Sequence, residues 1–321
     1  MDDRIEIYGR GRLPPRLETR LAEHFTLRAD PDPFPGEDWL QRHGAAVRGL
    51  ANGSFTPLTA ELMDRLPNLE IISSIGVGYD MIDVAAAKQR GILVTHTPDV
   101  LNADVANYAL LLLLAASRDL ILQDSHVRSG RWASDGATPL THTLEGQPVG
   151  IVGLGRIGRE LARKLEIFGG PILYHGRSEQ AEVPYEFCPD LYDMARRCSA
   201  LILCLPGGAG TDGLIDARVL DALGPEGILV NVARGSVVDQ PALIDALNEG
   251  RLGRAALDVF DDEPDVPQAL RDSDRVILSP HAASATVETR QAMFDLTADN
   301  LIAYFNDGAA RTPVPECRET A

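Results

Sequence analysis

The sequence has only four cysteines, Cys188, Cys198, Cys204 and Cys317, and their spacing excludes the common cysteine chemistries. None forms a C-x-x-C pair, and none lies near histidines at the spacing of a zinc site, so we expect no bound metal. Cys204 lies in an apolar run and is expected to be a core residue. Free thiols are typical of proteins in a reducing cytoplasm.

Long apolar runs and a surplus of basic residues are also absent. The longest apolar stretch, Tyr108 to Ala116, is too short to cross a bilayer. The segment MDDRIEIYGR carries charge where a signal peptide has an apolar core, so we expect no export and a cytoplasmic location. Thirty basic residues against 47 acidic ones give a net charge of −17. That charge repels phosphate backbones and anionic lipids, which argues against nucleic-acid and membrane partners.

Motifs of several other enzyme classes are missing as well. The chain has no G-x-S-x-G, no P-loop lysine motif and no H-E-x-x-H, which excludes the simplest hydrolase, NTPase and metalloprotease interpretations. Its 321 residues are 45% apolar and 24% charged, an ordinary composition that is enough for about two domains.

Short apolar runs rich in β-forming residues alternate with amphipathic segments along the chain. This alternation is typical of βαβ units and parallel sheets. A first series consists of residues 4–8, 45–49, 70–74 and 92–95. A second series consists of residues 149–152, 172–175, 200–205, 228–232, 255–259 and 276–279. The second series has the six strands of a dinucleotide-binding sheet, and the first predicts at least four strands of a smaller doubly wound domain.

A glycine-rich turn follows the first strand of the second series. The segment VGIVGLGRIG, residues 149–158, is read as strand, turn and helix start. Gly153 permits the tight turn, Gly155 lets the backbone approach a pyrophosphate, and Gly158 lets the helix pack closely on the strand. The helix N-terminus would hold the phosphates. We expect cofactor contacts from Gly153, Leu154, Gly155, Arg156, Ile157 and Gly158.

The end of the next strand carries a cation instead of a carboxylate. Sites that prefer NAD place Asp or Glu there to bind the ribose hydroxyls, whereas this chain has Gly176, Arg177 and Ser178. An arginine and a hydroxyl suit a 2′-phosphate. We therefore expect NADP(H) to be preferred over NAD(H). The alternative is that Arg177 stacks on the adenine and that both cofactors work.

Two helix-like stretches, Ala103 to Leu122 and Val287 to Tyr304, complete the organisation. The first is apolar enough to be mostly buried, and the second would return the chain to the first domain. The prediction is an α/β protein with two doubly wound parallel-sheet domains. Residues 100–284 would form a Rossmann nucleotide-binding domain inserted in a flavodoxin-like substrate (catalytic) domain of residues 1–99 and 285–321. We expect a cleft between the domains to hold the site.

Three polar residues follow consecutive strands of the second series. Arg234, Glu263 and His281 come after the fourth, fifth and sixth runs. The carboxyl ends of parallel strands share one edge of the sheet, where ligands bind. Each residue alone is more simply a surface cation, a solvated acid or a turn residue, but together they resemble a hydride-transfer site.

The ordered motifs resemble those of the D-isomer-specific 2-hydroxyacid dehydrogenases, and the match runs nearly from end to end. The motifs are SSIGVGYDMID at 73–83, TP at 97–98, the glycine turn at 149–158, NVARG at 231–235, LDVF at 257–260 with EP at 263–264, and SPH at 279–281. Within the family, GRS at 176–178 and HAASAT at 281–286 look most like the NADPH-dependent glyoxylate/hydroxypyruvate and hydroxyphenylpyruvate reductases.

The resemblance implies catalytic roles for Arg234, Glu263 and His281. Arg234 would bind the substrate carboxylate and polarise the ketone, and His281 would protonate the carbonyl oxygen as hydride arrives from NADPH. Glu263 would orient the imidazole and favour its charged form. Replacing Glu263 with Gln would then move the alkaline limb of the reduction profile to lower pH.

The resemblance also implies binding contacts outside this trio. Backbone amides around Gly76, Val77 and Gly78 would hold the substrate carboxylate. Further cofactor contacts would come from Leu205, Pro206, Thr211, Val232, Ala233 and Asp258, the last at the nicotinamide end. Two positions depart from the family pattern, with Asn107 in place of an acid and Pro206-Gly207-Gly208 in place of Pro-Leu-Thr.

Alternatives stay open on substrate and on class. The substrate is glyoxylate or hydroxypyruvate, with hydroxyphenylpyruvate or 2-ketogluconate as the alternative, and a dinucleotide-sensing binding protein is the alternative class. The family implies a homodimer formed through the nucleotide domain, by the helix near Tyr108 to Ala116, and the alternative is that this helix is entirely core of its own chain. The loop Gly9 to Pro14 is expected to face the substrate. Trp132 is expected to pack within its own chain, with a place in a site or an interface as the alternative.

Overall fold

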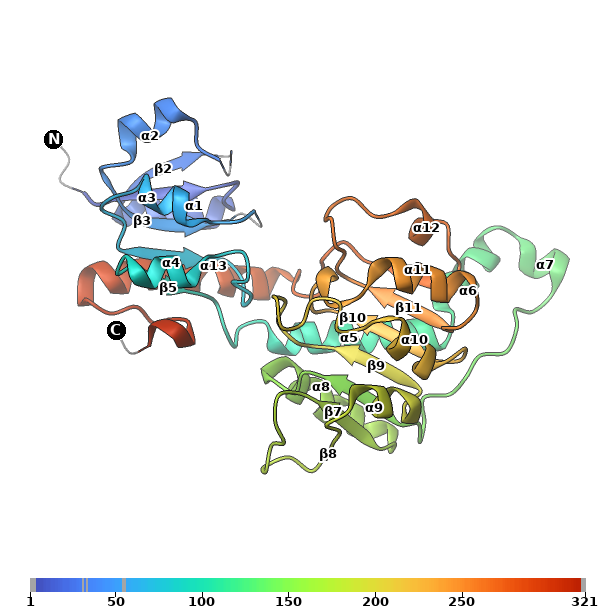
Figure 1. The fold of residues 1–321 in the computed structure, drawn as a ribbon. Coiled ribbons are helices and arrows are strands. Elements are labelled where there is room, and N and C mark those ends of the chain that lie inside the picture. Colours follow the sequence, from blue (N-terminus) through green and yellow to red (C-terminus); the bar gives the residue numbers. More distant parts are fainter. Residues whose placement is uncertain (1–3, 31, 33, 54–55, 319–321) are drawn as a thin grey trace. The chain divides into compact units, whose positions relative to one another are not determined.

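The computed structural model describes residues 4–30, 32, 34–53 and 56–318. The chain forms two compact units (Figure 1). Unit 1 consists of Met1–Leu101 and Thr286–Ala321, and unit 2 consists of Asn102–Ala285. The sequence-based boundaries, after residues 99 and 284, lie one or two residues from these.

Unit 1 is built on a five-stranded parallel sheet with the order β2-β1-β3-β4-β5. Its strands are β1 (Glu6–Arg10), β2 (Thr26–Asp30), β3 (Val47–Asn52), β4 (Ile71–Ser74) and β5 (Leu93–Thr95). This order is that of flavodoxin-like sheets, as expected. The sequence did not reveal β2, because its residues are polar and only partly buried at the edge of the sheet.

The helices of unit 1 cover this sheet and bring in the C-terminal segment. They are α1 (Pro15–His24), α2 (Glu37–His43), α3 (Ala60–Asp64), α4 (Val84–Gln89), α13 (Val287–Asp307) and the short 3-10 turn η3 (Pro315–Cys317). The side chain of Thr286 caps the start of α13, and Gly308 ends it in a left-handed conformation. Ala298 and Leu301 of α13 are fully buried in the core of unit 1. The long C-terminal helix therefore completes the first sheet domain.

Unit 2 contains a seven-stranded parallel sheet with the order β12-β11-β10-β9-β6-β7-β8. Its strands are β6 (Val149–Val152), β7 (Ile172–His175), β8 (Glu186–Phe187), β9 (Ala200–Leu203), β10 (Ile228–Asn231), β11 (Arg254–Leu257) and β12 (Val276–Leu278). The order is the Rossmann order 3-2-1-4-5-6 with one further strand. The expectation of six strands was wrong by one, because β8 is two residues long and leaves no periodic pattern.

The remaining elements of unit 2 are mostly helices on the two faces of this sheet. They are α5 (Asn102–Ser117), α6 (Leu120–Arg128), α7 (Arg131–Asp135), α8 (Arg156–Leu165), η1 (Glu166–Phe168), α9 (Leu191–Arg197), α10 (Ala217–Leu223), η2 (Gly235–Val237), α11 (Gln240–Asn248) and α12 (Gln268–Arg271). The single helix expected at Ala103 to Leu122 is two helices, because Asp119 adopts a left-handed conformation with φ of 53°.

No single helix among the described residues is long and apolar enough to cross a membrane. Helices α5 and α6 pass such a test only as a pair, and the chain bends by 61° between them. Leu112 and Leu113 of α5 lie in the hydrophobic core of unit 2. The apolar character of α5 is thus explained by burial within its own unit.

Candidate active site

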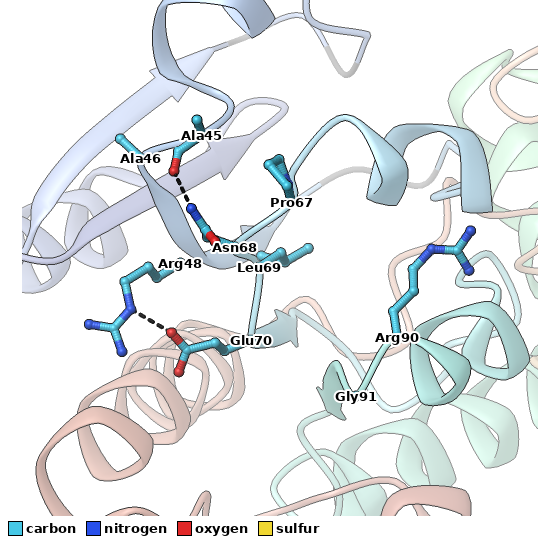
Figure 2. Close-up of a pocket in the computed structure, with 9 residues that line it drawn as sticks. All are labelled: Ala45, Ala46, Arg48, Pro67, Asn68, Leu69, Glu70, Arg90 and Gly91. Carbon is cyan, nitrogen blue, oxygen red and sulfur yellow. Dashed lines mark hydrogen bonds and ion pairs between the residues drawn. The ribbon is translucent and has the colours of Figure 1, made fainter.

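The pocket shown in Figure 2 lies in unit 1 at the amino ends of β3 and β4 and has a volume of about 400 Å³. Its polar side chains are already paired. The Nε of Arg48 donates to Glu70 Oε1 at 2.5 Å, and the Nδ2 of Asn68 donates to the Ala45 carbonyl at 2.7 Å (Figure 2). Ligands of open parallel sheets bind at the carboxyl ends of the strands. The pocket at the amino ends of β3 and β4 is therefore not the candidate site, which we look for at the carboxyl ends of the strands.

The glycine turn after β6 has a separate steric reason for each of its three glycines. Gly153 has φ of +95°, and a Cβ there would lie 2.8 Å from the Cys204 carbonyl oxygen. A Cβ on Gly158 would lie 2.2 Å from the Gly153 carbonyl oxygen, so only glycine allows α8 to pack on this turn. A Cβ on Gly155 would meet nothing within 4 Å. The space beside Gly155 is where a pyrophosphate fits.

The N-terminus of α8 is open to a ligand on the same side. Gly155 is its N-cap residue, and no side chain caps the helix there. Such an N-terminus attracts anions through its amides and dipole. Arg156 is exposed and Ile157 half-buried at the first positions of α8, whereas the side chain of Leu154 is buried, so Leu154 can contact a cofactor only by its backbone. The glycine turn and the N-terminus of α8, together called the unit 2 cradle, fit the pyrophosphate of a dinucleotide.

The loop after β7 carries the predicted cation. Gly176 is half-buried, and Arg177 and Ser178 are exposed. The side chain of Gln180, which the sequence did not single out, joins this loop to the glycine turn. Its Nε2 donates to the Leu154 carbonyl at 3.0 Å, and its Oε1 accepts from Arg159 at 2.5 Å. This contact fixes the two halves of the predicted phosphate site relative to each other.

Arg234, Glu263 and His281 follow β10, β11 and β12, which are neighbours in the sheet. The Nδ1 of His281 and the Oε2 of Glu263 lie 2.8 Å apart. The Oε1 of Glu263 accepts from the Phe260 amide at 3.0 Å. The carboxylate is thus held at both oxygens and directs one ring nitrogen of His281, which is how an acid–base histidine is oriented.

The surroundings of Glu263 keep its carboxyl ionised. Burial acts to raise its pKa, but the hydrogen bond and charge of His281, the Phe260 amide and the charge of Arg234 together act more strongly. The net result is a pKa below the usual value of 4.5. Glu263 is therefore a negatively charged partner for the imidazole near neutral pH.

Close backbone contacts place Arg234 beside this pair. A Cβ on Gly235 would lie 2.0 Å from the Phe260 carbonyl carbon, so glycine lets the turn after β10 touch the turn after β11. The Nδ2 of Asn231 donates to the Arg234 carbonyl at 2.8 Å. A Cβ on Gly207 would lie 2.9 Å from Cγ of Arg234, so the glycine that departs from the family pattern makes room for the arginine stem.

Asp258 is almost completely buried, at 1% exposure, beneath the loop that carries His281. Its Oδ1 accepts from Ser279 Oγ at 2.6 Å and from the Ala282 amide at 2.8 Å, and its Oδ2 accepts from the Ala283 amide at 2.9 Å. His281 itself has φ of 52°, a left-handed conformation that is uncommon for a residue with a side chain. The binding of nicotinamide by Asp258 stays a prediction.

The other predicted cofactor residues line the turns after β9 and β10. Leu205, Thr211 and Val232 are half-buried, Pro206 is exposed, and Ala233 is buried. The Thr211 hydroxyl lies 2.9 Å from the Pro206 carbonyl and 3.1 Å from the Gly208 carbonyl, and donates to them. Thr211 therefore shapes this turn, and its contact with a cofactor stays a prediction.

The predicted carboxylate-binding loop lies in unit 1 after β4. The Gly76 amide already donates to Thr97 Oγ1 at 3.0 Å. The imidazole Nδ1 of His96 lies 2.9 Å from the Val77 carbonyl and donates to it. No described residue accepts a hydrogen bond from the amides of Val77 and Gly78. Those two amides, rather than that of Gly76, are thus suited to an anion.

Within the segment from Gly9 to Pro14, Arg12 is exposed, and its contact with a substrate stays a prediction. Gly9 and Arg10 end strand β1, and Leu13 is buried in the core of unit 1. Arg10 is fully buried, and its guanidinium donates to Asn52 Oδ1 at 2.9 Å and to the Pro57 carbonyl at 2.8 Å. Arg10 therefore stabilises the end of β1 and is buried away from any substrate. Trp132 is 63% exposed and does not pack into the core of unit 2.

Comparison with known proteins identifies the class. Residues 110–283 match the family model described as "D-isomer specific 2-hydroxyacid dehydrogenase, NAD binding domain". The chain is 46% identical to glyoxylate/hydroxypyruvate reductase A of Arabidopsis thaliana, over 93% of this chain and 95% of that protein. It is 42% identical to 2-ketogluconate reductase of Gluconobacter oxydans, over 94% and 96%.

A solved structure extends this similarity to the fold. The NADPH-dependent glyoxylate/hydroxypyruvate reductase of Sinorhizobium meliloti, in complex with NADP and malonate, is 45% identical, with a TM-score of 0.92 over 98% of each chain. This chain belongs to the D-isomer specific 2-hydroxyacid dehydrogenase family. The predicted family and the two-sheet α/β fold are thereby confirmed.

Proposed function

We propose that this protein is an NADPH-dependent reductase that converts small 2-keto acids, glyoxylate and hydroxypyruvate, to D-2-hydroxy acids. The observation that carries the proposal is the 2.8 Å contact between His281 Nδ1 and Glu263 Oε2 at the carboxyl edge of a dinucleotide-type sheet. Relatives named glyoxylate/hydroxypyruvate reductase, 45–46% identical to this chain, support the choice of substrate.

The residues of unit 2 would divide the chemistry between them. Glu263 holds Nδ1 of His281, so we assign proton transfer to Nε2, which would protonate the carbonyl oxygen of the keto acid. Arg234 would bind the substrate carboxylate and polarise the ketone by its charge. Bound NADPH supplies the hydride for the carbonyl carbon. In unit 1, the Val77 and Gly78 amides would bind the substrate carboxylate as well.

The preference for NADPH rests on the loop after β7. The exposed Arg177 and the Ser178 hydroxyl would bind the 2′-phosphate, and no carboxylate occupies the tip of the strand. NAD(H) would serve as a weaker cofactor. The NADP-bound relative from Sinorhizobium meliloti supports this assignment.

A second candidate substrate is 2-ketogluconate, which a 42% identical relative is named for. Hydroxyphenylpyruvate is a third, on the same ground at 43% identity. Both share the 2-keto carboxylate that Arg234 and His281 would act on, and differ only in the side chain. The chemistry assigned to Arg234 and His281 is therefore the same for all of these substrates.

The test is a cofactor and substrate panel with the purified protein. NADPH or NADH oxidation is followed with glyoxylate, hydroxypyruvate, hydroxyphenylpyruvate and 2-ketogluconate. We expect fastest turnover with NADPH and one of the two small keto acids. Binding of NADPH without turnover of any substrate would contradict the proposal and favour a dinucleotide-sensing protein.

We also propose that the protein is a homodimer, through a different part of unit 2 than expected. The helix segment from Tyr108 to Ala116 is mostly core, with Ala109, Leu112 and Leu113 buried. Leu111 of that segment is exposed, and further large apolar side chains are exposed on α6, α7 and the segment after them. They are Leu120, Ile121, Val127, Trp132 and Leu140. Exposed large apolar side chains of this kind are typical of an interface. Sedimentation as a monomer at micromolar concentration would contradict the proposal.

A further inference from the structure

A hydrogen-bonded chain runs from helix α5 to the loop that carries His281. The Tyr108 hydroxyl lies 2.7 Å from Ser279 Oγ, and Ser279 Oγ lies 2.6 Å from Asp258 Oδ1. A serine hydroxyl has a single proton, and Asp258 receives it, so the Tyr108 hydroxyl is the donor to Ser279. The two hydrogen bonds therefore run in one direction, with Tyr108 donating to Ser279 and Ser279 donating to the Asp258 carboxylate.

Asp258, at the end of these hydrogen bonds, holds the backbone at His281 and at the two residues after it. The His281 amide donates to the Asp258 carbonyl at 2.8 Å, and the next two amides, Ala282 and Ala283, donate to the Asp258 carboxylate oxygens. These three bonds bracket the residue whose φ is 52°. A strained conformation of this kind persists only where its surroundings fix it. Asp258 supplies that restraint.

Burial makes the chain sensitive to loss of a single hydroxyl. Asp258 is 1% exposed and Ser279 is 6% exposed, so water cannot readily replace a missing donor. Removal of the Ser279 hydroxyl would leave Oδ1 of Asp258 with one donor fewer and let the carboxylate turn. The amides of Ala282 and Ala283 would then lose their alignment, and with them the direction of the His281 ring.

We propose that Tyr108 and Ser279 are positioning residues for His281, acting through the buried carboxylate of Asp258. They keep the loop of residues 279–283 in the one conformation that places Nδ1 on Glu263. Helix α5, which is mostly packed in the core of unit 2, would thus help to orient the imidazole of His281 through Tyr108. This inference rests on the proposed role of His281 in reduction.

The test compares Ser279→Ala and Tyr108→Phe with a matched control, Tyr185→Phe. The Tyr185 hydroxyl also makes one 2.7 Å hydrogen bond in unit 2, to Glu166, and has no part in the site. Two readouts are taken. The first is kcat and KM for hydroxypyruvate at saturating NADPH. The second is the NMR signal of the His281 Nδ1 proton in the free protein, assigned by its absence in His281→Asn.

We expect kcat to fall about 10- to 100-fold in Ser279→Ala, the range for a misplaced catalytic group, and by a smaller factor in Tyr108→Phe. The Nδ1 proton signal should broaden or disappear in both variants, while both remain folded at the assay temperature and Tyr185→Phe keeps the wild-type signal. Ser279→Thr, which keeps the hydroxyl, should restore the signal.

Two results would overturn the inference. One is an unchanged Nδ1 proton signal in both Ser279→Ala and Tyr108→Phe. The other is a fall in kcat while that signal stays as in the wild type. The NMR readout does not require turnover, so it tests the inference even if the wild-type protein fails the substrate panel.

Discussion

The two units each present a glycine loop at the carboxyl edge of a parallel sheet, but they hold these loops by different means. In unit 2, the turn from Gly153 to Gly158 is fixed by steric contact, since a Cβ on Gly158 would lie 2.2 Å from the Gly153 carbonyl oxygen. In unit 1, the loop from Gly76 to Gly78 is held by two side chains, since the Gly76 amide donates to Thr97 Oγ1 and His96 Nδ1 donates to the Val77 carbonyl.

The difference follows from what comes next in the chain. The turn of unit 2 leads into α8, whose N-terminal amides are already aligned by the helix, so close packing is enough to aim them. The loop of unit 1 does not begin a helix of comparable length, and its amides must be aligned by neighbouring side chains. The unit 2 turn should therefore be disrupted by a larger side chain in place of a glycine. The unit 1 loop should be disrupted by loss of the Thr97 hydroxyl.

Alanine at Gly155 and at Gly158 should separate binding from folding in unit 2. Gly158→Ala forces a clash between backbone and Cβ, and we expect a loss of about 3 kcal/mol or more in unfolding free energy. Gly155→Ala meets open space in the free protein, so its Tm should not change, while NADPH binding weakens by about 1–3 kcal/mol. Thermal unfolding and cofactor titration measure the two effects. Equal Tm values for both variants would contradict the steric account.

Arg177→Ala tests the cation that extends the unit 2 cradle. Loss of a charge-assisted hydrogen bond to a 2′-phosphate costs about 1.5–3 kcal/mol, which is about a 10- to 100-fold loss in NADPH affinity. NADH affinity should hardly change. Arg163→Ala, which removes an exposed arginine from the last turn of α8, controls for net charge. An unchanged ratio of NADPH to NADH affinity would show that Arg177 does not select the cofactor.

Thr97→Val tests the unit 1 loop. The variant leaves the Gly76 amide without its hydroxyl partner, and we expect KM for hydroxypyruvate to rise about fivefold, for about 1 kcal/mol, with kcat little changed. Thr95→Val is the matched control, because the Thr95 hydroxyl is also buried but donates to the Ile72 carbonyl at 3.3 Å. If the two variants have the same KM, the Thr97 hydrogen bond does not hold the loop.

The smallest expected effect concerns the ion pair between Glu263 and His281 in unit 2. Glu263 has a pKa below its usual 4.5, so its ionisation stabilises the fold above that pH and the contribution is lost as pH falls through the lowered value. The stability difference between wild type and Glu263→Gln should therefore be about 1 kcal/mol or less at pH 6 and shrink as the pH falls below 4.5. Urea unfolding at several pH values measures it, and a difference that grows with acidity would be the opposite result.

The sequence predicted the fold class and most strands because the short apolar runs of the two sheets are buried and alternate regularly with amphipathic segments. It did not reveal β2 or β8, which lie at sheet edges and are polar or very short. It also extended one helix across Asp119, because a left-handed residue leaves no signal in the apolar periodicity. Edge strands and single backbone reversals depend on contacts distant in sequence.

The site could be predicted only as far as its motifs reach. Arg234, Glu263 and His281 follow recognisable patterns, and the structure gathers them at one sheet edge. The buried position of Asp258, its link to Tyr108 across 150 residues, and the room that Gly207 leaves for Arg234 are products of packing. No local sequence pattern predicts such contacts, because each depends on which turns pack against each other in the folded protein.

The most direct measurement compares wild type and His281→Asn in NADPH oxidation with hydroxypyruvate at saturating cofactor, alongside NADPH titration of both. We expect a fall in kcat of about 10²–10⁴-fold, the usual contribution of a positioned acid, with NADPH affinity unchanged. Equal rates for the two proteins would contradict the assignment of His281 as the proton donor, and with it the reductase mechanism proposed for this site.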